Sequence, residues 1–186
     1  MEGRLDYLKV YISNYLSRSI SILDYQSFEL EREIKLDEDI YPHNFCIDKT
    51  KNLAYIPSSH GGEVYVLDAN TLNPVAVIGT ENMPHGFDID PINNRLYVAC
   101  VNSIVCVDII NKCIYKQVKT SFKPWHIKID KEKREIYIST LDGKVVVVNE
   151  ETLEIIKSID EFLVPIQICF NYENKKIHVN SACSVT

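Results

Sequence analysis

The sequence predicts an all-β fold built from repeated four-stranded antiparallel sheets, and three observations support it. Prolines recur at positions 42, 84, 124 and 165, at spacings of 42, 40 and 41 residues. Each proline begins a short apolar segment that ends in Asp or Asn. Three more short segments, rich in β-branched and aromatic residues, complete each unit. Four short strands in every repeat of about 40 residues are typical of the blades of a β-propeller.

Each class of segment predicts one strand of a blade. The proline-led segments are the innermost strands, and the second segments begin with Tyr or His seven residues after the closing Asp or Asn. The third segments end in another Asp or Asn, which initiates a turn by accepting hydrogen bonds from nearby backbone amides. The predicted strands are innermost 42–48, 84–90, 124–130 and 165–171; second 11–14, 55–58, 97–100, 137–140 and 178–181; third 20–24, 65–68, 105–108 and 146–149; outermost 30–34, 75–78, 114–118 and 155–159.

The predicted strands form one β-propeller domain over residues 1–186, with about four blades. The first unit lacks an innermost strand, and the last unit has only two strands. We therefore expect a partial ring, or a composite ring that a second copy completes as a homodimer, in preference to a closed four-blade ring. The blade units are approximately 8–41, 42–83, 84–123, 124–164 and a partial unit 165–186.

The second segments resemble the motif of the YVTN-repeat β-propellers, which include lactonase-like members. The resemblance rests on Tyr-Ile-Ser-Asn at 11–14, Tyr-Val-Ala-Cys at 97–100 and Tyr-Ile-Ser-Thr at 137–140. Pro57 and His178 depart from this motif, so we expect an irregular second strand at Pro57 and a frayed last unit at His178. The resemblance implies a fold and not a function, since propellers include enzymes, scaffolds and ligand binders.

Composition and charge exclude several classes of function. The formal net charge of -6 provides no general attraction to nucleic acid or anionic lipid. The chain has no apolar run long enough to span a membrane and does not begin like a signal peptide. The six cysteines form no C-x-x-C pair, so we expect mostly buried thiols and a cytoplasmic location.

The residues that follow the repeat prolines are the first candidates for a ligand site. His43, His85 and His126 lie at the entrance to successive innermost strands, and Trp125 precedes His126. Three imidazoles around one axial mouth are weak candidates for a metal site, because histidine is a common metal ligand. The interpretation that we favour is that each histidine donates a hydrogen bond to a loop carbonyl. We therefore predict ligand binding there, with no metal and no cofactor.

Asp88 and Lys128 are further candidates for ligand binding. They occupy a position of the innermost strand where the other units have Cys46 and Cys169. A position that varies between units whose neighbouring positions repeat is free to determine specificity. The recurring Asp and Asn residues at strand ends, by contrast, are expected to be turn residues.

The sequence contains no G-x-S-x-G, H-E-x-x-H, Walker or G-x-G-x-x-G signature. We therefore predict a non-catalytic binding module whose axial mouth, formed by loops between blades and between second and third strands, holds a partner protein or a small ligand. One alternative is a metal-assisted lactonase or lyase, because YVTN-type propellers resemble lactonases and streptogramin lyases that use axial histidines and a divalent metal. Another is a structural segment of a longer propeller.

Overall fold

The computed structural model describes residues 9–58, 60–80 and 83–182, which form seventeen strands in five antiparallel sheets. The first sheet contains β1 (Lys9–Asn14), β2 (Ser19–Asp24) and β3 (Leu30–Lys35). The second contains β4 (Cys46–Asp48), β5 (Leu53–Ser58), β6 (Glu63–Asp68) and β7 (Pro74–Gly79). The third contains β8 (Pro84–Asp90), β9 (Arg95–Cys100), β10 (Ser103–Asp108) and β11 (Cys113–Lys119). The fourth contains β12 (Pro124–Asp130), β13 (Glu135–Thr140), β14 (Val145–Asn149) and β15 (Ile155–Ile159), and the fifth β16 (Pro165–Asn171) and β17 (Lys176–Ser181).

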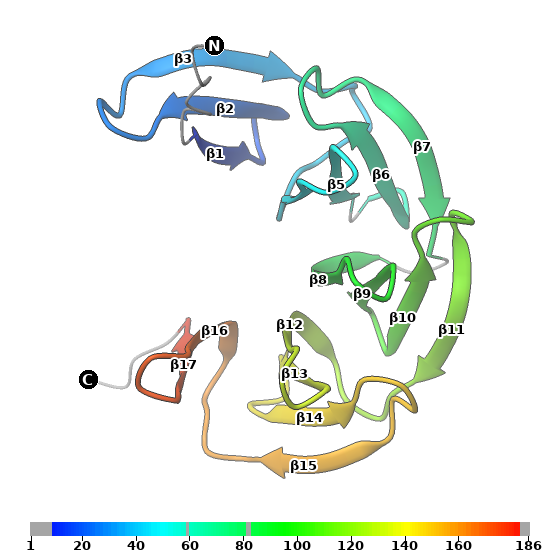
Figure 1. Ribbon diagram of the computed structural model, residues 1–186. Helices are drawn as coiled ribbons and strands as arrows, with labels where there is room; N and C mark the ends of the chain where they lie inside the picture. Colours follow the sequence, from blue (N-terminus) through cyan, green and yellow to red (C-terminus); the bar gives the residue numbers. More distant parts are fainter. Residues whose placement is uncertain (1–8, 59, 81–82, 183–186) are drawn as a thin grey trace.

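The five sheets follow one another along an open arc (Figure 1). Strands β8, β12 and β16 face the inside of the arc, and β3, β7, β11 and β15 form its outer rim. The first and last sheets lie at the two ends of the arc, and in the described residues β16 pairs only with β17. The structure thus confirms the all-β fold of four-stranded antiparallel propeller blades.

The repeated Asp and Asn residues are turn residues, as predicted. The Oδ1 of Asp68 accepts hydrogen bonds from the backbone amides of Asn70 and Thr71, at 3.0 and 2.9 Å. Asp108 and Asn149 bind the amides two and three positions ahead in the same way. Each carboxylate or amide oxygen therefore fixes the turn that returns the chain to the next strand.

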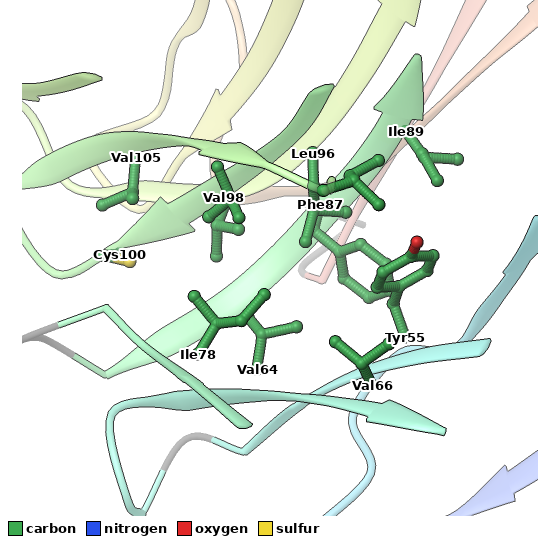
Figure 2. Close-up of a cluster of buried hydrophobic side chains, with 12 residues drawn as sticks. Tyr55, Val64, Val66, Ile78, Phe87, Ile89, Leu96, Val98, Cys100 and Val105 are labelled. Carbon is green, nitrogen blue, oxygen red and sulfur yellow. The ribbon is translucent and has the colours of Figure 1, made fainter. Parts of the chain in front are cut away.

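Apolar side chains fill the spaces between neighbouring sheets. Figure 2 shows the cluster between the second and third sheets, where Tyr55 and Val66 face Phe87 and Leu96. Because each central sheet is covered on both faces, its middle strands are apolar at successive positions, as in the buried run of β10. The described residues include no helix with the length and apolarity needed to cross a membrane.

Two expectations about irregular strands were wrong. Strand β5 is continuous through Pro57, which pairs with Val64 of β6, and β17 pairs with β16 along its whole length, including His178. The irregularity lies in β4, whose ladder to β5 covers only Cys46–Asp48. Pro57 has no amide hydrogen to donate to a neighbouring strand. It is tolerated in β5 because the short β4 has no residue paired with it.

The cysteines divide between the interior and the surface. Cys100 and Cys106 are buried between sheets and Cys46 is half-buried, whereas Cys113 and Cys169 are exposed. The expectation of mostly buried thiols was therefore only partly correct, because Cys113 lies on an outermost strand. All five are free, and Cys183 lies outside the described residues.

Candidate functional site

Irregular pairing at the start of the innermost strands determines which side chains reach the inside of the arc. The ladders of β8, β12 and β16 to their neighbours each shift register directly after the repeat proline. A β-bulge places two residues opposite one and redirects their side chains. The two positions that follow each proline can therefore face the same space.

Those two positions line one pocket of about 300 Å³. Four successive units contribute to it, so residues far apart in the sequence meet there. The pocket contains four of the six predicted site residues. Its lining residues are His43 and Asn44, His85 and Gly86, Trp125 and His126, and Ile166 and Gln167.

The rings in the pocket contact one another. His85 stacks on Trp125, with ring centroids 4.5 Å apart and planes 29° apart. His43 approaches both rings edge-on, at centroid distances of 6.3 Å to His85 and 6.5 Å to Trp125. The pocket wall therefore consists of one stacked pair and one ring nearly perpendicular to it.

Three more rings extend this cluster towards the first sheet. The ring of Tyr15 lies 4.3 Å from that of His43, and Tyr41 lies 4.4 Å from His60 and 5.5 Å from Tyr15. Sequence reasoning missed Tyr15, Tyr41 and His60 as individual residues. The available signal was that Tyr15 and His60 lie in loops between second and third strands, which were expected at the axial mouth.

The imidazoles of the pocket are uncharged at neutral pH. Burial lowers the pKa of His126 to about 4. Desolvation lowers the pKa of His85 and of His43, and a neighbouring histidine adds to each effect. The Nδ1 of His126 accepts a hydrogen bond from the backbone amide of Ile168 at 3.4 Å, so its proton resides on Nε2.

In residues 9–58, 60–80 and 83–182, His43, His85 and His126 do not show the hydrogen bonds to loop carbonyls that we favoured. His126 accepts a bond from a backbone amide, and the buried Nδ1 of His85 has no hydrogen-bond partner among the described residues. An unpaired buried nitrogen is destabilising.

Gly86 permits the close approach of β8 and β12 beneath the pocket. A Cβ atom on Gly86 would lie 2.5 Å from the Cα of His126 and 2.6 Å from the carbonyl oxygen of Trp125. Both contacts are to backbone, which cannot move aside as a flexible side chain would. The sequence signal was that the other units have Asn44, His126 and Gln167 at this position.

The structure places Asp88 and Lys128 outside the histidine pocket. Asp88 Oδ2 lies 3.0 Å from Lys128 Nζ and accepts a hydrogen bond from the backbone amide of Ile129 at 3.0 Å. Both side chains line a separate pocket of about 390 Å³ that also includes Tyr172. Asp88 therefore connects β8 to β12.

The part of the chain that the structure describes contains no group of three or more His, Cys, Asp or Glu side chains arranged to hold a metal ion. His43, His85 and His126, the weak metal candidates, line the pocket without forming such a group. The three histidines therefore share a pocket but not the arrangement of a metal site.

Comparisons with known proteins agree with the fold. No protein-family model matches the chain, and no curated protein matches it. Hydrazine synthase of Kuenenia stuttgartiensis is similar in structure, with a TM-score of 0.79 and 16% identity over 96% of this chain. The dihydro-heme d1 dehydrogenase NirN, in complex with DHE, has a TM-score of 0.64 and 16% identity over 85% of this chain. The matches span 58% and 36% of those two chains. At this identity the likeness shows the fold alone, which is that of a β-propeller.

Proposed function

We propose that the protein is a non-catalytic β-propeller module that binds a small ligand, or a side chain of a partner protein, in the histidine pocket. The observation that carries this proposal is the convergence of the same two positions from four successive units on one pocket. Concave sites with a few well-placed polar groups among aromatic side chains are typical of ligand binding.

The chemistry of the lining supports binding in preference to catalysis. Among the residues that the structure describes, the lining contains no Ser, Cys, Asp or Glu side chain that could act as nucleophile or carboxylate base. The rival function is the metal-assisted lactonase or lyase, in which His85 and His126 would hold a divalent metal. Stoichiometric zinc that is lost in His85→Ala would favour that rival.

The wider assignments are also proposals. We infer from the Tyr-led second strands that the chain belongs with the YVTN-repeat propellers, and from the free cysteines that it resides in the cytoplasm. We further propose that a second copy completes the ring, because within residues 9–182 the first sheet has three strands and the fifth has two.

A fragment screen by ligand-observed NMR tests the proposed function. His43→Ala removes an exposed ring of the pocket, and His178→Ala removes an exposed histidine from β17 as a matched control. We expect fragments that bind the wild-type chain and the control but not His43→Ala. A screen with no such fragments, or with fragments that bind both variants equally, would contradict ligand binding in the pocket.

A further inference from the structure

We infer that the pocket binds an uncharged, planar nitrogen heterocycle of one or two fused rings, such as a purine base. This inference rests on the proposed function and specifies the class of ligand. It follows from the charge, the planes, the hydrogen-bonding atoms and the volume of the pocket.

The charge of the lining disfavours an ionised ligand. None of the eight lining residues that the structure describes carries a carboxylate, an ammonium or a guanidinium group. The imidazoles are uncharged at neutral pH, because desolvation lowers the pKa of His43, His85 and His126. A charged ligand would lose hydration without meeting a counter-charge, which costs more than burying a neutral ring.

The planes of the lining favour a flat ligand. Six of the eight described lining residues have side chains that end in planar groups: the rings of His43, His85, Trp125 and His126 and the amides of Asn44 and Gln167. A flat ring parallel to the stacked His85–Trp125 pair lies nearly perpendicular to His43, whose plane makes angles of 73° and 71° with that pair. Stacked and edge-to-face contacts are the two preferred arrangements of aromatic rings, and one planar ligand can make both.

The polar atoms of the lining match the edge of a nitrogen heterocycle. The Nε2 of His126 carries the proton and donates, because Nδ1 already accepts the amide of Ile168. The amides of Asn44 and Gln167 each provide donors and an acceptor, and the neutral imidazole of His85 is a further polar group of the lining. Proteins recognise unstacked nucleic acid bases by this combination of stacking and in-plane hydrogen bonds.

The volume limits the size of the ligand. About 300 Å³ is at the lower end of the range for small-molecule sites. One or two fused rings fit such a space, whereas a macrocycle or a base with a long substituent would extend beyond it.

Tryptophan fluorescence tests this inference directly, because Trp125 is the single tryptophan of the chain. The probe is adenine, which is planar and uncharged at neutral pH. We expect saturable quenching by adenine, with binding at least about tenfold weaker for adenosine monophosphate, which adds charge, and for glucose, which is not planar. His85→Phe retains a ring against Trp125 but removes the imidazole nitrogens, so adenine binding should weaken by about tenfold. His178→Phe is the matched control and should bind adenine as the wild-type chain does.

The outcomes separate this inference from the proposed function. Saturable quenching that is stronger with glucose or adenosine monophosphate than with adenine would overturn the ligand class while supporting binding in the pocket. Adenine binding that is equal in His85→Phe and wild type would overturn the assignment of His85. No quenching by any probe would also overturn the inference, and the NMR screen with His43→Ala would then decide the proposed function independently.

Discussion

Replacing Gly86 by alanine tests the close approach of β8 and β12 on which the pocket depends. The new methyl group would lie within 2.6 Å of backbone atoms of both Trp125 and His126, so one of the two strands has to shift. Overpacking of this kind lowers the free energy of unfolding by about 1–3 kcal/mol. We expect a loss of about 2–3 kcal/mol for Gly86→Ala, because the contacted atoms are backbone atoms. At about 2–4 °C per kcal/mol, the melting temperature should fall by roughly 4–12 °C.

Gly79→Ala is the matched control, because Gly79 also lies at a strand position and its Cβ would meet nothing within 4 Å. Relief of chain entropy in the unfolded state should leave this variant neutral or more stable by up to about 1 kcal/mol. The assay is thermal unfolding followed by circular dichroism, with Trp125 fluorescence as a local probe. If Gly86→Ala unfolds at the same temperature as Gly79→Ala, the proposed packing of β8 against β12 is wrong.

Three further predictions concern protonation, charge pairing and assembly. As the pH falls from about 6.5 to 4, the unfolded chain takes up a proton on His126 that the folded chain does not, so the free energy of unfolding decreases. In urea titrations, the free energy of unfolding should depend less steeply on pH in His126→Gln than in the wild-type chain. An equal dependence on pH would argue against a buried imidazole. Asp88→Ala should lower the free energy of unfolding by about 1–3 kcal/mol, because it leaves the Ile129 amide without its acceptor. Lys128→Met should lower it by less than about 1 kcal/mol, because it removes only a surface ion pair. Equal losses of stability in urea unfolding would show that only the ion pair matters. Light scattering after size exclusion should give twice the mass of the chain if a second copy completes the ring, and a stable monomer would contradict that assembly.

Much of the fold could be predicted because each strand carries its own signal. The turn residues Asp68, Asp108 and Asn149 bind backbone amides within three positions, so their effect depends on local sequence. The apolar strands are buried on both faces, which removes the alternation of half-buried sheets and leaves continuous β-branched runs such as 145–148. Local turn chemistry and two-sided burial together define the blade.

The site could be predicted only in part, because it depends on contacts between units. The position after each proline identified His43, His85 and Trp125, but the bulge that brings the next position into the same pocket leaves no signal in one strand. Asp88 lines a different pocket from the histidines, and its carboxylate accepts a hydrogen bond from the amide of Ile129 in the neighbouring blade. Sequence patterns within a unit do not contain such distances.

Soaking crystals of the chain in a mixture of small heterocycles tests the central claim most directly. We expect difference density for a bound ring in the pocket, in contact with the stacked His85 and Trp125 and within hydrogen-bonding distance of His126 Nε2. Density confined to other surfaces, with this pocket occupied only by water, would contradict the claim that the four units converge to bind a ligand there.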